Sequence, residues 1–111
     1  MSASRITSEL WVAAYKKRLE LEAIPIFVVH RGDKVSGAIM VRVSDLKGKA
    51  KVFVQSYDTE GCGIWLELAN DTDFEIDSVI RKQKTMDPDI WVLEIEVLNG
   101  RHMLDDTTLS R

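Results

Sequence analysis

The sequence predicts a single α+β domain in the order α-β-β-β-β-α-β, with two helices packed on one face of a mostly antiparallel sheet of about five strands. Three observations predict this class. Two segments show the apolar period of amphipathic helices, five show the alternation or the β-branched content of strands, and short glycine- or aspartate-containing turns separate the first four strands. A chain of 111 residues can bury one core without metal or disulfide, so residues 1–111 are expected to form one domain.

The first helix is predicted over residues 7–21. At about 100° per residue, its apolar side chains fall on one broad arc, formed by Leu10, Trp11, Val12, Ala14, Tyr15, Leu19 and Leu21. Thr7 or Ser8 can cap its start, and Pro25 ends it because the residue before a proline favours extended backbone. The wide arc predicts packing against a sheet.

Four strands are predicted to follow, over residues 26–30, 38–43, 51–57 and 64–69. The segments between them, residues 31–34, 44–49 and 58–63, contain glycine and aspartate and are interpreted as turns. The first two strands are interpreted as a hairpin with a loop of several residues. Short turns between successive strands favour an antiparallel meander over βαβ units.

A second helix is predicted over residues 73–85. Thr72 followed by Glu75 fits a capping box at its start. Its inward stripe is expected to consist of Ile76, Val79, Ile80, Gln83 and Met86. Pro88 ends the helix, and a last strand follows over residues 90–97. The polar segment 101–111 is expected to be loose, so that the ordered core spans about residues 5–100.

Composition excludes several classes of protein. The net charge of −3 and the mixing of acidic and basic residues argue against a nucleic-acid-binding field. A single cysteine cannot form an internal disulfide, and no apolar run resembles a signal peptide or a membrane span. A cytoplasmic location with no membrane association is therefore expected. The sequence has no phosphate loop, dinucleotide fingerprint, serine elbow or zinc-ligand spacing, so no cofactor is expected.

Two carboxylates share one face of the predicted last strand. Alternation places Glu94 and Glu96 on the face opposite Trp91, and Asp87 and Asp89 precede the strand. Such a group could bind a divalent cation in a metal-dependent hydrolase or nuclease. The simpler interpretation is that these carboxylates are solvated and pair with lysines or arginines of a neighbouring strand. We favour the second interpretation, so no metal site is predicted.

Two further motifs have simple explanations. His30 precedes Arg31-Gly32-Asp33, and a histidine near such charges can transfer protons, but a glycine between charged residues suits a turn. Cys62 lies between two glycines without a histidine nearby in the sequence, which indicates a turn thiol and not a nucleophile. Neither motif predicts catalysis.

Basic residues offer a second alternative function. A patch for weak RNA association could form from Lys47, Lys49, Lys51, Arg81, Lys82 and Lys84, with Phe53 and Tyr57 as stacking side chains. The surrounding acidic residues dilute this charge, and surface lysines usually serve solubility. Nucleic-acid binding is therefore not the favoured prediction.

Trp65 poses a question of orientation. In an alternating strand, either Trp65 or its neighbours Ile64 and Leu66 must point outward. Burial or partial burial of the tryptophan is the favoured interpretation. An exposed Trp65 would instead provide a contact surface, for example in a homodimer.

Several motifs occur along the chain in a fixed order. They are Leu10-Trp11-Val12, Ile24-Pro25, Arg31-Gly32-Asp33, Trp65 and, most specific, Asp87-Pro88-Asp89-Ile90-Trp91-Val92-Leu93-Glu94-Ile95-Glu96. In these motifs the sequence resembles the family of small bacterial proteins known as domain of unknown function 1491, over roughly residues 5 to 105. The resemblance implies a stand-alone cytoplasmic domain without an assigned activity, substrate or catalytic residue.

The favoured function is a non-enzymatic binding or interaction module that uses the sheet face not covered by helices. Its surface is expected near Arg31, Asp33, Trp65 and Glu94, and its partner is an unidentified protein or a second copy of the chain. The alternatives are the metal-dependent hydrolase or nuclease with Asp87, Asp89, Glu94 and Glu96, and RNA association through the lysine patch.

Overall fold

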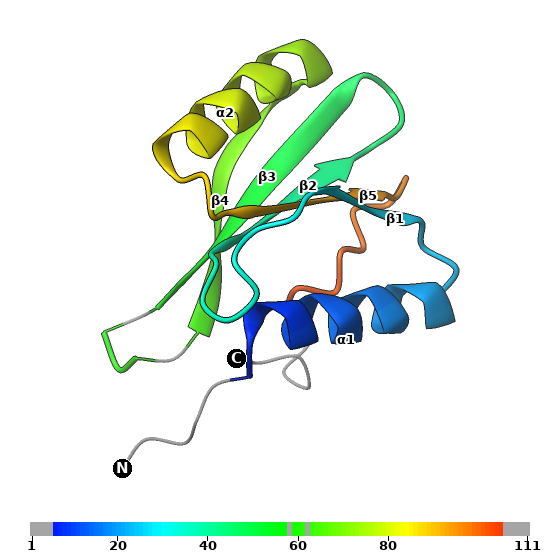
Figure 1. The fold of residues 1–111 in the computed structure, drawn as a ribbon. Helices are drawn as coiled ribbons and strands as arrows, with labels where there is room; N and C mark the ends of the chain where they lie inside the picture. Colours follow the sequence, from blue (N-terminus) through cyan, green and yellow to red (C-terminus); the bar gives the residue numbers. More distant parts are fainter. Residues whose placement is uncertain (1–5, 58, 62, 106–111) are drawn as a thin grey trace.

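The structure is a computed structural model that describes residues 6–57, 59–61 and 63–105. Figure 1 shows its two helices and five strands, which follow the predicted order. The elements are α1 (Ser8–Leu21), β1 (Ile26–His30), β2 (Ile39–Ser44), β3 (Lys49–Tyr57), β4 (Gly63–Thr72), α2 (Asp73–Met86) and β5 (Trp91–Glu96). The predicted α+β class is confirmed. Within the part of the chain described here, neither helix is long and apolar enough to cross a membrane.

The strands form one sheet in the order β1-β5-β2-β3-β4. β5 lies between β1 and β2, antiparallel to β1 and parallel to β2. The sheet is therefore mixed, and the predicted hairpin of the first two strands is wrong. Residues 31–38 are long enough to pass around the N-terminal end of β5, and local sequence does not reveal that a strand from the far end of the chain enters there.

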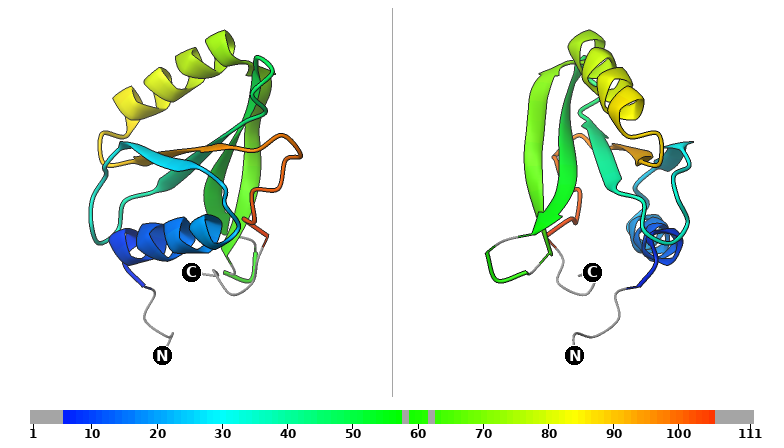
Figure 2. Two further views of the ribbon diagram at one scale, coloured as in Figure 1. Left: turned by 90° about the vertical axis from the view of Figure 1, so that its right-hand side faces the viewer. Right: turned by 60° about the vertical axis from the view of Figure 1, so that its left-hand side comes forward.

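The two helices lie on opposite faces of the sheet and not on one face as predicted (Figures 1 and 2). The side chains of β2 alternate between the two faces of the sheet. Ile39 and Val41 belong to the core beneath α1, whereas Met40 belongs to the core beneath α2. The reason is that β2 and β5 are central strands whose side chains are mostly buried on both faces. A continuous apolar run does not say which helix covers which face.

The larger core lies on the α1 face. Trp11, Tyr15 and Leu19 of α1 are almost fully buried there. The ring of Trp11 stacks on Tyr15 at 4.9 Å and packs against Trp65 of β4 at 5.3 Å between ring centroids. The favoured partial burial of Trp65 is therefore confirmed.

Residues 97–105, called the strap below, close this core at the end of α1. Met103 and Leu104 are buried, and the Tyr15 hydroxyl donates a hydrogen bond of 2.8 Å to the carbonyl oxygen of His102. The prediction of a loose segment from residue 101 is therefore wrong for residues 101–105. Two apolar residues within a polar stretch give no periodic signal, so the sequence does not reveal this packing.

Both helices begin as expected and expose more apolar surface than expected. Thr7 Oγ1 accepts a hydrogen bond from the Leu10 amide, and Thr72 Oγ1 accepts one from the Glu75 amide. The predicted arc of α1 is too wide, because Leu10 and Leu21 at its margins are exposed. The buried residues of α2 are Ile76 and Ile80, and the last residue of the predicted stripe, Met86, is exposed.

Trp91, the first residue of β5, fastens the connection between β1 and β2 to the sheet. Its indole Nε1 donates a 2.7 Å hydrogen bond to the carbonyl oxygen of Asp33, and the Arg31 guanidinium lies 5.1 Å from its ring centroid. The Asp33 amide donates to the carbonyl oxygen of Asp89 at 2.9 Å. Residues from two distant motifs thus meet around one buried indole.

The same connection holds the start of α1. Buried Ser8 donates from its hydroxyl to the carbonyl oxygen of Gly37 at 2.6 Å, and its amide donates to the carbonyl oxygen of Val35. The Asp33 carboxylate accepts hydrogen bonds from the amides of Val35 and Ser36, which lowers the pKa of Asp33. The loop is therefore a fixed structural joint between α1 and β5.

A substitution at Gly32 tests the role of this loop as a structural joint. A Cβ atom at Gly32 would overlap the backbone oxygen of Asp89 and lie 2.7 Å from Cδ1 of Trp91. We expect Gly32→Ala to lower the free energy of unfolding by about 3 kcal/mol, since backbone atoms cannot yield. Urea denaturation measures this change. Gly48→Ala is the control, because Gly48 has a positive φ but nothing within 4 Å of an added Cβ, and it should cost about 1 kcal/mol. Equal losses in the two variants would contradict the prediction.

Candidate functional site

The α2 face of the sheet is only partly covered. The core beneath α2 contains Met40, Ala50, Val52, Ile76, Ile80, Ile90 and Val92, with Val54 and Ala69 packed against it. These residues come from α2, β2, β3, β4, β5 and the residue before β5, and β1 contributes none. On the α1 face, by contrast, all five strands contribute to the core. Five strands span about 19 Å, whereas one helix covers a width of about 10 Å, so one side of the face stays open.

The uncovered part lies over β1. Phe27 and Val29 are 51% and 54% exposed, whereas Ile26 and Val28 pack on the α1 face. A depression of about 150 Å³ lies between β1 and α2, and it is lined by Val29, Arg42, Asp77, Ile80, Arg81, Val92 and Glu94. We call these seven residues, together with Phe27, the α2 groove.

Arg42 of β2 forms the charged floor of the α2 groove. Its side chain is 11% exposed and forms ion pairs with three carboxylates. The guanidinium contacts Asp77 Oδ1 through Nη1 and Asp73 Oδ1 through Nη2 at 2.9 Å. Glu94 Oε1, on the neighbouring strand β5, lies 3.6 Å from Nε. Negative charges thus outnumber the central positive charge by three to one.

The neighbouring carboxylates keep Arg42 charged. Burial lowers the pKa of Arg42, but hydrogen bonds to Asp77 and Asp73 and the charge of Glu94 outweigh burial and raise it. The buried Nε has no hydrogen-bond partner among the described residues. The arrangement suits a fixed charge that holds α2 to the sheet, and it leaves carboxylate oxygens directed at the groove.

The four carboxylates of the metal-site alternative lie at different places. Asp87 caps the end of α2 and accepts a hydrogen bond from the Asp89 amide within the turn before β5. Glu94 lies in the middle of β5, paired with Arg42, and Glu96 is the last residue of β5. Throughout the described ranges, no group of three or more His, Cys, Asp and Glu side chains is arranged to hold a metal ion.

The four residues expected to form an interaction surface also separate. Arg31 and Asp33 lie beside Trp91 at the N-terminal end of β5. Trp65 faces α1, and Glu94 faces α2 on the other side of the sheet. The structure therefore does not bring them together. Glu94 is the member of this set that lines the α2 groove.

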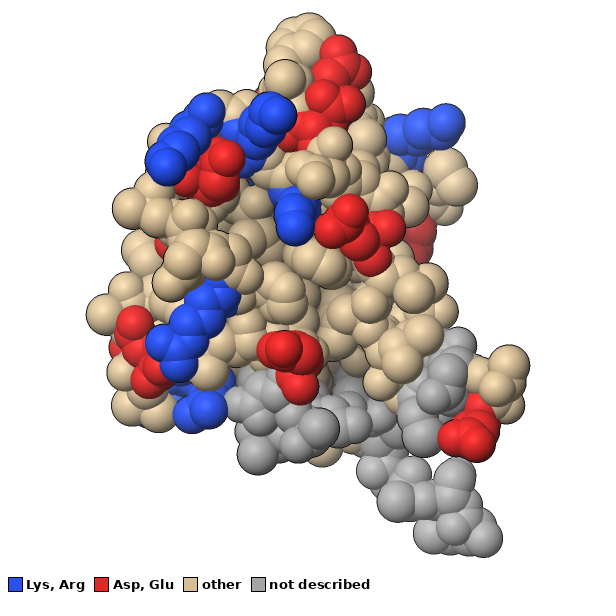
Figure 3. All heavy atoms as spheres, turned by 180° about the vertical axis from the view of Figure 1, so that it is seen from behind, with Lys and Arg blue, Asp and Glu red and all other residues tan. Residues whose placement is uncertain are grey.

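The basic residues of the RNA alternative fall into two groups. The amide of Asp73 donates to the carbonyl oxygen of Gly48, so Lys47 and Lys49 lie at the start of α2. Arg81, Lys82 and Lys84 lie in its second half, at least about 12 Å further along the helix. Figure 3 shows acidic and basic side chains interspersed over the rear face of the molecule. The six residues do not form one continuous patch.

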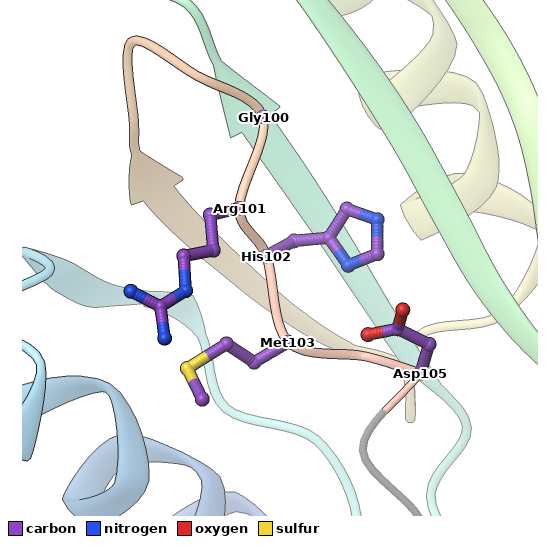
Figure 4. A pocket seen from close by; sticks show the side chains of 5 residues that line it. All are labelled: Gly100, Arg101, His102, Met103 and Asp105. Atoms are coloured by element: carbon purple, nitrogen blue, oxygen red, sulfur yellow. The ribbon is translucent and has the colours of Figure 1, made fainter.

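A second depression, of about 290 Å³, lies along the strap and is lined by Gly100, Arg101, His102, Met103 and Asp105. Figure 4 shows Arg101 and Met103 pointing to one side of the strap and His102 to the other. His102 Nδ1 accepts a 3.0 Å hydrogen bond from the Leu104 amide, and its ring lies 4.7 Å from that of Phe53. These contacts hold the strap in place.

The electrostatics of His102 follow from this packing. Burial lowers the pKa of His102, Asp105 partly offsets the effect, and Lys51 adds to it. The imidazole is therefore held neutral, as its role as an acceptor requires.

His30 and Arg31, of the motif at the start of the β1–β2 connection, make structural contacts. His30 Nδ1 lies 2.8 Å from the carbonyl oxygen of Ile90 and donates to it across the sheet. Arg31 forms an exposed ion pair with Glu9 of α1. Cys62 lies outside the described residues.

The sequence predictions missed Phe27, Val29, Arg42 and Asp77. Arg42 could have been found, because it is a single charge within an apolar strand, and such a charge requires a carboxylate partner when it is buried. The exposure of Phe27 and Val29 could not have been predicted from the sequence, because it depends on how far α2 reaches across the sheet towards β1.

Comparison with known proteins agrees with this fold. The family model for "Protein of unknown function (DUF1491)" matches residues 6–105. The chain belongs to the DUF1491 family. The resemblance identified from the sequence motifs is thereby confirmed, and the family is one of unknown function.

Solved structures support the assignment. A DUF1491 family protein from Caulobacter crescentus, in a crystal structure, is 33% identical and matches with a TM-score of 0.83 over 90% of this chain and 95% of its own. An NMR structure of a DUF1491 family protein from the same organism matches with a TM-score of 0.79, 33% identity and coverage of 92% and 94%. A protein from A. tumefaciens, 23% identical, shares the fold with a TM-score of 0.73 and coverage of 85% and 87%. No curated protein matches this DUF1491 domain.

Arg42→Ala tests the charged floor of the groove. The variant leaves three carboxylates facing one another without their cation, and we expect it to lower the free energy of unfolding by about 2 kcal/mol, less than for a fully buried pair because the carboxylates are partly solvated. Urea denaturation measures the loss. Lys51→Ala breaks the exposed pair with Glu67 and should cost below about 0.5 kcal/mol. If Arg42→Ala lowered the free energy of unfolding no more than this control does, the proposed role of Arg42 in holding α2 to the sheet would be refuted.

The strap predicts a pH dependence. Because the pKa of folded His102 lies below its ordinary value of 6.5, the unfolded chain binds a proton more readily, and stability should fall as the pH decreases below about 6.5. Chemical denaturation between pH 7 and pH 5 measures the slope. His102→Gln keeps an acceptor without titrating, so the dependence of stability on pH should be flatter in this variant. An unchanged slope in His102→Gln would count against this role.

Proposed function

We propose that this DUF1491 domain is a cytoplasmic, non-enzymatic protein-interaction module, and that its α2 groove receives an amphipathic helix of a partner protein. The observation that carries the proposal is the half-exposed pair Phe27 and Val29 beside a helix that covers only part of its sheet face. Apolar side chains gathered next to a depression are typical of protein-binding surfaces.

The geometry favours a helix as the occupant. Helices pack side by side at 8–10 Å, so a helix next to α2 would lie over β1 and the half-buried Glu94 of β5. Phe27 and Val29 are two residues apart on β1, whose register shifts between Val28 and His30. Residues two apart on a regular strand lie about 7 Å from each other, close to the rise of about 6 Å between residues four apart on a helix. A partner helix with apolar side chains at this spacing would complete the layer that α2 begins.

The chemistry of the groove supports binding over catalysis. Its carboxylates Asp77 and Glu94 are engaged with Arg42, and Arg81 donates to the hydroxyl of Ser78. Charges held in such pairs provide recognition and specificity. They are not poised for proton transfer as a general acid or base would be.

Selection of helical peptides tests the proposal. Phage display of random 18-residue peptides on the immobilised domain should enrich sequences with apolar residues at i, i+3 or i+4, and i+7. By fluorescence anisotropy, these peptides should bind Val29→Glu at least tenfold more weakly than the unmodified domain. Leu66→Glu on β4 is the control, since Leu66 is similarly exposed but lies on the other edge strand of the sheet. The selected peptides should bind this variant with the same affinity as the unmodified domain.

Two outcomes would contradict the proposal. One is that no peptide is enriched, or that the enriched peptides bind Val29→Glu and Leu66→Glu equally well. The other is that Mg²⁺, Mn²⁺ or a single-stranded RNA binds the domain while every peptide fails, which would favour the metal-dependent or RNA-binding alternative.

A further inference from the structure

The two ends of the α2 groove differ in charge. The start of α2 lies at Gly48, beside the C-terminal ends of β2 and β5. This end carries Asp73, Asp77 and Glu94 around Arg42, with Glu96 beyond Glu94. Lys47 and Lys49 also lie near the start of α2, but they do not line the groove. Glu96 lies on the same face as Glu94, two residues further along the strand. The other end, where α2 leads into β5, carries Arg81, which lines the groove, and Lys84. Asp87 at this end does not line the groove, and its carboxylate accepts a hydrogen bond from the Asp89 amide.

The carboxylates at the acidic end retain capacity for a second cation. Three carboxylates, those of Asp73, Asp77 and Glu94, surround one buried guanidinium there, and Glu96 lies two residues beyond Glu94. Asp77 and Glu94 remain 50% and 30% exposed, and the ion pairs with Arg42 engage one oxygen of each. A carboxylate has about four lone-pair positions, so a cationic group arriving from solvent can be accepted without displacing Arg42.

We infer that the helix that fills the α2 groove runs antiparallel to α2 and places a lysine or arginine of its last turns against Glu94 and Glu96. This inference rests on the proposed function. Helices favour basic residues near the C-terminus and acidic residues near the N-terminus. In the antiparallel direction these preferences match the groove, with the basic end of the partner helix over Glu94 and Glu96 and its acidic end towards Arg81 and Lys84.

A second copy of the chain fits this surface less well. The exposed side of α2 is polar apart from Phe74 and Met86, which lie at its opposite ends, and the exposed side of α1 places Lys17 between Leu10 and Leu21. Neither helix therefore offers an apolar stripe that would cover Phe27 and Val29 together with basic residues at one end. The observations favour a different polypeptide.

A charge-reversal experiment tests the inference. The probes are the 18-residue peptides selected on the unmodified domain, labelled with fluorescein. We expect them to carry lysine or arginine in their C-terminal third. Their affinity should fall at least tenfold for Glu96→Lys and less than twofold for the matched control Glu20→Lys, which makes the same change in net charge on the exposed side of α1. Replacing the basic residue of the peptide with glutamate should restore binding to Glu96→Lys.

The outcomes distinguish this inference from the function on which it rests. Peptides that lose binding to Val29→Glu but bind Glu96→Lys and Glu20→Lys equally would overturn the inference and leave the proposed function standing. Peptides that bind Val29→Glu normally would overturn both. A dimer of the purified domain by light scattering that Val29→Glu converts to a monomer would show that a second copy occupies the groove, which also overturns the inference.

Discussion

The fold depends on the placement of β5 between β1 and β2. This strand pairs with both neighbours, and its alternating side chains fill both cores, with Trp91 and Leu93 beneath α1 and Val92 beneath α2. Among the described residues it is also the last strand along the chain, so β1 and β2 are joined only through a segment distant from both in sequence. The buried indole of Trp91 holds the β1–β2 connection over the end of β5 through the hydrogen bond to Asp33. Because that connection also binds Ser8, the position of α1 depends on the same joint.

This arrangement explains why the two faces of the sheet differ. On the α1 face, one helix and the strap together cover all five strands, and the side chains of Trp11 and Trp65 fill the space between them. On the α2 face, a single helix is linked at its start to β2 by the ion pairs of Arg42 with Asp73 and Asp77. Its width does not reach β1. The apolar residues of β1 and the carboxylates around Arg42 are therefore exposed side by side, and this juxtaposition makes the α2 groove the strongest candidate for recognition.

The motifs that identify the DUF1491 family acquire a physical meaning in this structure. Arg31, Gly32 and Asp33 meet Asp89 and Trp91 from the other end of the chain, and together they form the joint around the buried indole. These residues hold the fold. The residues of the α2 groove other than Val92 and Glu94 lie outside the motifs on which the resemblance depends. Family membership and the candidate site thus rest on largely different parts of the chain.

The sequence by itself determined the secondary structure, with helix caps at Thr7 and Thr72, and the facing of β5, with Trp91 and Glu94 on opposite sides. These features follow from interactions between residues close in the chain, such as caps, turns and the two-residue alternation of a strand. The expected pairing of Glu94 with a basic residue of a neighbouring strand is confirmed. Only the tertiary structure decided that this residue is Arg42, and it also decided the strand order, the opposite placement of the helices and the burial of Met103. Strands that are apolar on both faces fit several arrangements equally well locally, so the choice among them depends on contacts between segments distant in sequence.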